Sequence, residues 1–263
     1  MERGEIHPLS GGLASVYSAR CAKKDGFNED AAALISLGTA SAVLLVADGL
    51  GGGPAGQQAS SLAVQTVIDS IARGMKEDLM LRTAILNGLE AANQAVQEMG
   101  VGAATTIAIV ELQDGIVRPY HVGDSMILIV GQRGKIKLQT ISHSPVGFAV
   151  EAGLMDEREA MFDSDRHVVS NVVGCPQMKI ELGPSVKLAP RDSVVLASDG
   201  LFDNLYVEEV IDRVRKGPLE SATRRLAHDS HRRMNTPEGN QPSKPDDLTF
   251  VLFRPQPHCR NGS

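Results

Sequence analysis

Short apolar runs separated by polar turn residues fill most of this chain, and two longer amphipathic segments interrupt them. The run at 42–47 is unbroken, as in a strand buried on both faces, and the run at 31–37 leads into it across a glycine-containing turn. This spacing predicts a β-hairpin. A break at Pro54-Ala55-Gly56 then precedes two segments, ending near residues 73 and 99, with apolar residues at helical spacing. We expect these segments to form an antiparallel helix pair that covers one face of a sheet.

Strand patterns dominate the second half of the chain. Turn pairs such as Asp114-Gly115 separate four apolar runs, so we expect antiparallel neighbours at 105–112, 116–122, 126–130 and 136–141. The span 142–183 has weak periodicity and several turn residues, which predicts a mobile excursion from the sheet. Further elements are expected as a strand at 194–197, helices at 207–214 and 219–234, and a last strand at 248–253.

The order of these elements defines the fold class. Helices, a series of hairpin strands, more helices and a last strand predict an α+β sandwich with antiparallel sheets at its centre. Composition does not change near the middle of the 263 residues. We therefore expect one domain over residues 1–255 and a C-terminal tail over residues 256–263.

Acidic residues stand at the ends of several predicted strands. Asp48 and Asp199 each close an apolar strand and precede a glycine, and Asp124 lies between two apolar runs. The pairs Glu29-Asp30 and Asp246-Asp247 precede apolar runs. A single Asp-Gly pair is most often a turn, but five such strand ends indicate a common site at one rim of a sheet. Two carboxylates ~4 Å apart repel by about 4 kcal/mol at an effective dielectric of 20, so this group would need hard cations such as Mg²⁺ or Mn²⁺.

Charge and cysteine content narrow the function classes. The net charge of −6 and the lack of a basic stripe argue against nucleic-acid binding. The three cysteines are far apart and lack metal-ligand spacing, which argues against a disulfide framework or a zinc site and indicates a reducing compartment. No apolar run approaches the ~18 residues of a membrane span, so we expect a cytoplasmic protein without membrane contact.

Six short motifs follow one another along the chain. They are Asn28-Glu29-Asp30, Val46-Ala47-Asp48-Gly49-Leu50-Gly51-Gly52, residues 102–106, His121-Val122-Gly123-Asp124-Ser125, Ser198-Asp199-Gly200-Leu201 and Asp246-Asp247-Leu248-Thr249. Each is weak alone, but in this order they resemble the motifs of the metal-dependent serine/threonine protein phosphatases, the type 2C or PPM family. The resemblance covers nearly the whole chain, whose compact length is similar to that of bacterial members.

This resemblance implies an αββα sandwich, in which two central antiparallel β-sheets are flanked by antiparallel helix pairs. It also implies a centre of two Mn²⁺ or Mg²⁺ ions at one end of the sheets. By position, Asp48 would bridge both ions, and Glu29 with the Gly49 carbonyl would complete one of them. Asp199 and Asp246 would bind the other ion.

The same resemblance implies further roles near this centre. Asp124, together with Asp199, would hold a weaker third ion. Asp30 would orient a metal-bound water, which makes Asp30 and Asp48 the expected catalytic residues. The span 142–183 corresponds to the family's flap beside the site. Ser125 and Ser198 have no partner base, so we interpret them as hydrogen-bonding residues rather than nucleophiles.

The implied activity is hydrolysis of phosphoserine and phosphothreonine by a hydroxide that bridges the two ions. The expected substrate is a phosphorylated protein, the product of a serine/threonine kinase, and we expect the enzyme to be a monomer. A phosphoesterase acting on small molecules would share the same site.

The chain departs from the family pattern at several positions. Asp25 stands where an arginine usually contacts the substrate phosphate, and Lys24, Lys23 and Arg20 are the candidates to replace it, although a lysine cannot form the two-pronged contact of arginine. Asp247 stands where asparagine is usual. These departures leave an alternative hypothesis, a catalytically inactive phosphatase-like module that binds a phosphoprotein or a regulatory partner.

Overall fold

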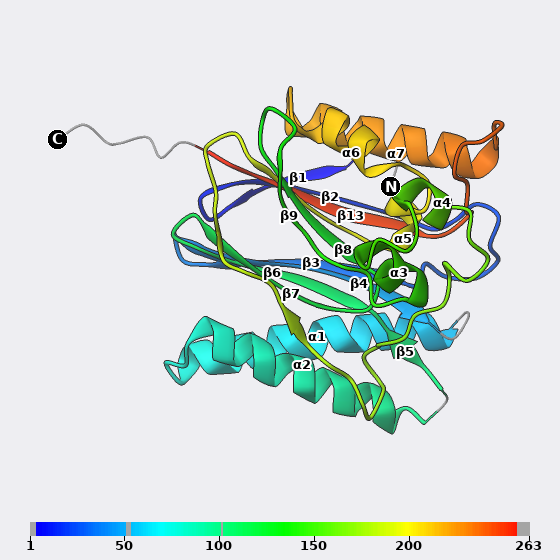
Figure 1. Cartoon of the computed structure of the whole chain (residues 1–263). Coiled ribbons are helices and arrows are strands. Elements are labelled where there is room, and N and C mark those ends of the chain that lie inside the picture. The colour runs from blue at the N-terminus through cyan, green and yellow to red at the C-terminus, as the bar shows by residue number, and fades with distance from the viewer. Residues whose placement is uncertain (1–3, 51–53, 101, 257–263) are drawn as a thin grey trace.

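Two antiparallel β-sheets lie face to face between two layers of helices (Figure 1). The computed structural model describes residues 4–50, 54–100 and 102–256. The six-stranded sheet runs in the order β1 (Glu5–Leu9), β2 (Gly12–Ala19), β13 (Leu248–Pro255), β12 (Ser193–Ala197), β8 (Met126–Val130) and β9 (Ile136–Gln139). The seven-stranded sheet runs in the order β10 (Glu181–Leu182), β7 (Ile116–Val122), β6 (Ile107–Gln113), β4 (Ser41–Leu50) and β3 (Asp30–Leu37), with β11 (Val186–Lys187) beside β7 and β5 (Ala104–Thr105) beside β4.

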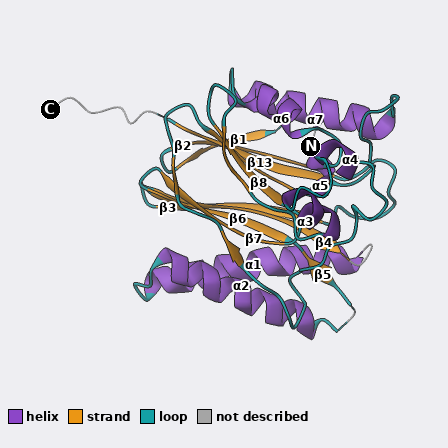
Figure 2. Cartoon of the chain, in the orientation of Figure 1, coloured by secondary structure: helices purple, strands orange, loops and turns teal. Residues whose placement is uncertain are grey.

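Two pairs of helices cover the outer faces of the two sheets, as the colouring by secondary structure shows (Figure 2). Helices α1 (Pro54–Lys76) and α2 (Leu81–Glu98) pack on the seven-stranded sheet, and α6 (Val207–Val214) and α7 (Leu219–Asn235) pack on the other. The predicted sandwich of two antiparallel sheets flanked by helices is therefore confirmed.

Strand β4 shows why its apolar run has no polar interruptions. Val43, Leu45 and Ala47 contact the layer of α1 and α2, while Leu44 and Val46 point into the core between the sheets. Because successive side chains of a strand point to opposite faces, a strand covered on both faces needs apolar residues at every position. Asp48 marks the place where this double cover ends.

Small residues let the first helix pair approach closely. A Cβ atom on Gly88 of α2 would lie 3.0 Å from the Cβ of Ser70 and 3.1 Å from the Cα of Val67, both on α1. The helix pair that the sequence predicts is thus held in contact by a glycine and a serine as well as by apolar side chains.

Two expectations about the path of the chain are wrong. Pro54 does not precede the first helix as a break but is its first residue, where a missing N–H leaves no helical hydrogen bond unmade. The four runs between residues 105 and 141 are not all neighbours, because β6 pairs with β7 and β8 with β9, whereas β7 and β8 belong to different sheets. Gly123, with φ of 103°, turns the chain from one sheet to the other.

The span 142–183 leaves the sheets and returns to them. It carries the short helices α3 (Pro145–Glu151) and α4 (Glu157–Ala160) and ends near β10, which pairs with β7. The interpretation of this span as a flap, and its mobility, stay predictions. The single-domain organisation over residues 1–255 also stays a prediction. Gly51 and Gly52 of the second motif and residues 257–263 of the expected tail lie outside the described residues.

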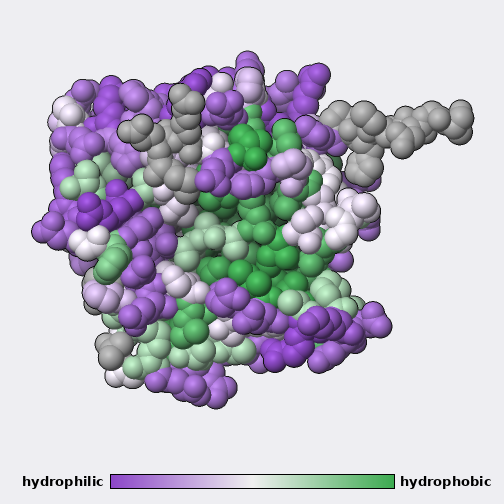
Figure 3. Space-filling view, turned by 180° about the vertical axis from the view of Figure 1, so that it is seen from behind, coloured by the Kyte–Doolittle hydropathy of each residue, from purple (hydrophilic) through white to green (hydrophobic). Residues whose placement is uncertain are grey.

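The face opposite to that of Figure 1 is apolar at its centre and hydrophilic along both helical layers (Figure 3). On this side the sheets end in β1 and β3, and Ile6 of β1 is an exposed apolar side chain. Among the residues that the structure describes, no helix has both the length and the apolar character needed to cross a membrane.

Candidate metal centre

Two aspartates from the seven-stranded sheet face each other at its rim. Asp30 is the first residue of β3 and is directly opposite Asp48 in the register of β3 with β4. The neighbouring backbone is fixed, because Asp48 donates its N–H to Thr106 Oγ1 at 3.0 Å and its carbonyl accepts the Thr106 N–H at 2.8 Å. Glu29 is brought alongside by a bond of 3.1 Å from the Gly49 N–H to the Glu29 carbonyl.

The six-stranded sheet contributes its own acids to the same rim. Asp199 follows β12 directly and begins the short helix α5 (Asp199–Phe202), and Asp246 lies just before β13, the neighbour of β12. Ser198 Oγ donates a hydrogen bond of 2.8 Å to Asp30 Oδ2, which joins the two sheets at this point. Ser198 therefore acts as the hydrogen-bonding residue that the sequence predicts.

Electrostatic contacts show that the acids of both sheets form one group. Burial raises the pKa of Asp48 well above its usual value, and Asp30, Asp199, Asp124 and Asp246 raise it further. The predicted convergence of strand-end carboxylates is thus present in the fold. The roles of these residues as metal ligands stay predictions.

Three neighbours of Asp48 hold their protons more tightly than ordinary aspartates. Burial raises the pKa of Asp30 to about 8, although hydrogen bonds from Ser198 and Thr249 oppose the shift. Burial and then Asp199 and Asp203 raise the pKa of Asp124 to about 7. Burial raises the pKa of Asp199 to about 6. The group carries more negative charge than it can hold in fully ionised form without cations.

The donor set suits a hard divalent cation. All the converging side chains of the group offer carboxylate oxygens, and Asp199 Oδ1 is buried without a hydrogen-bond partner among the described residues. The backbone beside Glu29 is also packed tightly, because a Cβ on Gly49 would lie 2.1 Å from the Gly56 carbonyl oxygen and 2.7 Å from that of Glu29. The residues present therefore fit a Mg²⁺ or Mn²⁺ centre.

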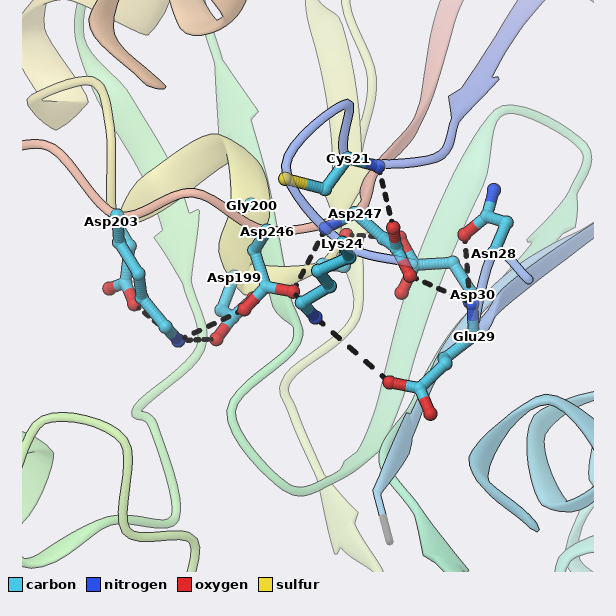
Figure 4. Close-up of polar contacts among 12 residues, drawn as sticks. Cys21, Lys24, Asn28, Glu29, Asp30, Asp199, Gly200, Asp203, Asp246 and Asp247 are labelled. Atoms are coloured by element: carbon cyan, nitrogen blue, oxygen red, sulfur yellow. Dashed lines mark hydrogen bonds and ion pairs between the residues drawn. The ribbon is translucent and has the colours of Figure 1, made fainter. Parts of the chain in front are cut away.

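Only one of the three candidates for phosphate binding lies at this rim. Lys24 Nζ forms an ion pair with Asp246 and lies 4.0 Å from Glu29 Oε2 (Figure 4). Lys23 Nζ donates to the Met234 carbonyl at 2.6 Å, and Arg20 donates to the Gly26 carbonyl at 2.9 Å. Lys24 is thus the candidate that lies beside the carboxylates, and its role in phosphate binding stays a prediction.

Asp247 has a structural function that its sequence position did not reveal. Its Oδ1 accepts the Cys21 N–H at 2.7 Å, and its Oδ2 accepts the Glu29 N–H at 2.8 Å (Figure 4). Because both oxygens accept N–H groups, an aspartate at this position anchors both ends of the loop that carries Lys24. An asparagine could accept only one of these bonds.

Sequence reasoning missed two residues of the site. Asp203 lies near Asp199, and Lys244 Nζ contacts both of them. The spacing of four residues between Asp199 and Asp203 was an available signal, since residues i and i+4 share a helix face. Lys244 gave no such signal within its polar loop.

A second group of titratable side chains lies beside Gly123. His143 Nδ1 accepts the Gly123 N–H at 3.0 Å, so its Nε2 carries the hydrogen that is donated to Glu181 Oε2 at 3.0 Å. His121 stacks on His143 with ring centroids 4.3 Å apart and donates from Nε2 to the Ile141 carbonyl at 2.9 Å. Burial and then His143 lower the pKa of His121. Since His143 has no lone pair left for a metal ion, this group holds the turn before Asp124 rather than a cation.

A cavity of about 520 Å³ adjoins the carboxylates and extends under the span 142–183. Asp124, Asp199 and Asp203 line its acidic end, and apolar side chains such as Phe202 and Leu205 line its wall. The cavity is large enough to accept side chains next to a phosphorylated residue.

This sequence pattern is shared with known proteins. The family model described as protein phosphatase 2C matches residues 19–238. A putative protein phosphatase 2C-type of Streptococcus pyogenes is 31% identical over 179 residues, which cover 64% of this chain and 71% of that protein. Protein phosphatase PhpP of Streptococcus pneumoniae is 29% identical over 198 residues, or 70% of this chain and 77% of that protein.

Solved structures share the fold. The Streptococcus agalactiae serine/threonine phosphatase matches with a TM-score of 0.77 and 24% identity over 92% of this chain and 99% of that chain. Serine/threonine phosphatase Stp1 from Staphylococcus aureus matches with a TM-score of 0.78 and 23% identity over 95% of this chain and 98% of that chain. The chain belongs to the protein phosphatase 2C family. The alternative of an inactive module has no support among these relatives, which are named phosphatases.

Stability of the chelator-treated protein is expected to fall as pH rises from 6.5 to 8. The pKa of Asp30 is raised to about 8 and that of Asp124 to about 7, so the folded state binds protons that the unfolded state has already lost. The lost stability should be about 2 kcal/mol, at about 1.4 kcal/mol per pH unit for each proton, or roughly 4–8 °C in Tm. Calorimetry at both pH values in EDTA measures this, and saturating Mn²⁺ should remove the trend. A higher Tm at pH 8 than at pH 6.5 in EDTA would contradict the proposed proton uptake.

Proposed function

We propose that this protein is a divalent-cation-dependent phosphatase that hydrolyses phosphoserine and phosphothreonine in proteins. The observation that carries the proposal is the convergence of carboxylates from both sheets at one rim, in a chain of the protein phosphatase 2C family. The proposed cations are two Mn²⁺ or Mg²⁺ ions. One solved relative, the catalytic domain of PstP, is described in complex with two manganese ions.

The proposed ligands are those that the family resemblance implies, and the position of each carboxylate supports them. Asp48 lies centrally and would be shared, with Glu29 and the Gly49 carbonyl on one side. Asp199 and Asp246 lie together at the end of the six-stranded sheet and would complete the other side. Two divalent cations at this place would supply an activated water and would offset negative charge on the phosphoryl oxygens.

Two residues of this chain would act directly beside the reacting phosphate. Asp30 is held by Ser198, and without cations its pKa of about 8 keeps it protonated at neutral pH. Cations bound beside it would favour its carboxylate form, which could then orient a water and accept its proton. Lys24 would leave its contact with Asp246 to meet the phosphate with its ammonium group. As a point charge it would give weaker orientation than an arginine.

The cavity next to the carboxylates favours a protein substrate over a small phosphoester. It offers about 520 Å³ beyond the acidic rim, with apolar Phe202 and Leu205 on one wall and Arg158 stacked 4.8 Å from the ring centre of Tyr206 on another. A peptide could place residues that flank the phosphorylated side chain there. Opposition to a kinase, a monomeric state and a cytoplasmic location are parts of this proposal that stay predictions.

Phosphate release from a phosphothreonine peptide should depend on added Mn²⁺. We expect rapid turnover with millimolar Mn²⁺ and turnover near background in excess EDTA, because the carboxylates alone repel a phosphate. Measuring inorganic phosphate with the peptide and with p-nitrophenyl phosphate tests this. Absence of turnover, or turnover that does not respond to EDTA, would contradict the proposal. Hydrolysis of p-nitrophenyl phosphate but not of the phosphothreonine peptide would indicate a small-molecule phosphoesterase.

A further inference from the structure

The ammonium group of Lys244 lies inside the carboxylate group. Its Nζ forms an ion pair with Asp199 Oδ2, and it lies 2.9 Å from Asp203 Oδ2 and 3.5 Å from Asp246 Oδ2. Figure 4 shows the carboxylates of Asp199, Asp203 and Asp246 turned toward one another around these contacts. A single lysine therefore contacts three acids, two of them at the ends of α5 and one, Asp246, two residues after the lysine itself.

The chain holds Lys244 in place through its backbone. Asn204, which is fully buried, accepts the Lys244 N–H with its Oδ1 at 2.8 Å and donates from Nδ2 to the Lys244 carbonyl at 2.8 Å. The preceding residue, Ser243, is tied by its Oγ to the Arg233 carbonyl at 2.8 Å. Because both main-chain groups of Lys244 are bound to one buried amide, the backbone of Lys244 is fixed where its side chain reaches the acids.

The electrostatics agree with this geometry. Burial alone would lower the pKa of Lys244, but Asp199 and Asp203 raise it well above its usual value, so the side chain stays charged. Lys244 in turn lowers the pKa of both Asp124 and Asp199 against the effect of their burial. The lysine therefore offsets part of the negative charge at Asp199 and Asp203.

We propose that the Lys244 ammonium is a built-in cation for Asp199 and Asp203, which line the same cavity as Asp124, and that it takes the place of a third divalent ion there. This inference rests on the proposed two-cation centre. Asp199 then has two functions, because its Oδ2 pairs with Lys244 while its buried Oδ1 stays open toward a cation shared with Asp246. The weaker third ion that the family resemblance implies at Asp124 and Asp199 would have to compete with Lys244 for the same oxygens.

The number of bound Mn²⁺ ions tests the proposal. The full chain is stripped with EDTA, dialysed and titrated with Mn²⁺, and bound ions are counted by calorimetry and by the electron paramagnetic resonance signal of free Mn²⁺. We expect two ions in the wild type and three in Lys244→Gln, because the freed carboxylates then need a cation. Lys244→Arg keeps the positive charge and should bind two. Lys187→Gln, an equal change of charge at an exposed residue of β11, should also bind two.

Stability gives a second readout that does not depend on activity. In EDTA, Lys244→Gln should melt at least about 3 °C below Lys187→Gln, and saturating Mn²⁺ should close most of that gap. Three ions in the wild type, or equal counts in the wild type and Lys244→Gln, would overturn the inference while leaving the phosphatase proposal intact. A wild type that binds no Mn²⁺ would overturn both, and a wild type that binds two ions without hydrolysing the phosphopeptide would count against the phosphatase proposal alone.

Discussion

Replacing Asp199 with asparagine is expected to lower Mn²⁺-dependent hydrolysis of a phosphothreonine peptide by about 10³-fold or more. Asp199 contacts Lys244 and presents a buried oxygen without a hydrogen bond to the proposed cation site. The change removes the negative charge of this proposed metal ligand and leaves an amide oxygen, which binds a cation more weakly. Metal-ion stabilisation of a phosphoryl transition state is worth several kcal/mol, and each 1.36 kcal/mol is a factor of about ten in rate. Initial rates at several substrate and Mn²⁺ concentrations measure the effect on kcat/KM.

A matched variant separates this effect from a general loss of charge. Asp212→Asn removes the same charge from an exposed residue of α6 that pairs with Arg215, and its turnover should stay within about twofold of the wild type. Melting curves in Mn²⁺ check that both variants fold. If folded Asp199→Asn kept the turnover of the wild type, Asp199 would not be a ligand of the centre.

Adding Mn²⁺ to the chelator-treated protein is expected to raise Tm by roughly 5–10 °C. Ligand binding to the folded state alone stabilises by about 2.7 kcal/mol at a concentration ~100 times Kd, and 1 kcal/mol is about 2–4 °C for a chain of this size. The rise should be smaller in Asp48→Asn. Asp48 lies opposite Asp30 and is close enough to four other carboxylates for them to raise its pKa, so the substitution removes a central carboxylate of the proposed cation site. Asp48→Asn in EDTA should also melt above the wild type, since a source of repulsion is gone.

Ionic strength must be matched in this experiment, because salt alone screens carboxylate repulsion. NaCl at the same ionic strength should reproduce only a small part of the Mn²⁺ effect. Identical melting curves with Mn²⁺ and with NaCl would show that the acids do not form a cation site.

The position of the acidic residues at the ends of strands could be predicted because short stretches of sequence show it. The run before Asp48 is apolar at every position, as a strand covered on both faces requires, and the end of that cover is visible as a carboxylate followed by glycine. The same signal marks Asp199 after β12. Strand ends of this kind can be found without knowledge of the neighbouring strands.

Features set by distant contacts could not be predicted in this way. The turn at Gly123-Asp124 has the composition of a hairpin, but β7 pairs with β6 before it, whereas β8 pairs with β9 and with the distant β12. The two strands therefore lie in different sheets. Lys244 lies in a polar loop typical of a solvent-exposed surface, and its direction is fixed by Asn204, 40 residues earlier. A two-residue strand such as β10 is too short to show any period.

The bond from Ser198 to Asp30 spans the seam where one sheet meets the other, and the acids are divided between the two sides of that seam. The distances between the charged oxygens therefore depend on the position of one sheet relative to the other. A substitution in the apolar core between the sheets, such as at Leu44 or Phe253, should shift the carboxylates relative to one another and lower activity, although it changes no polar residue. We therefore expect the catalytic rate of this protein to depend on the alignment of its two sheets.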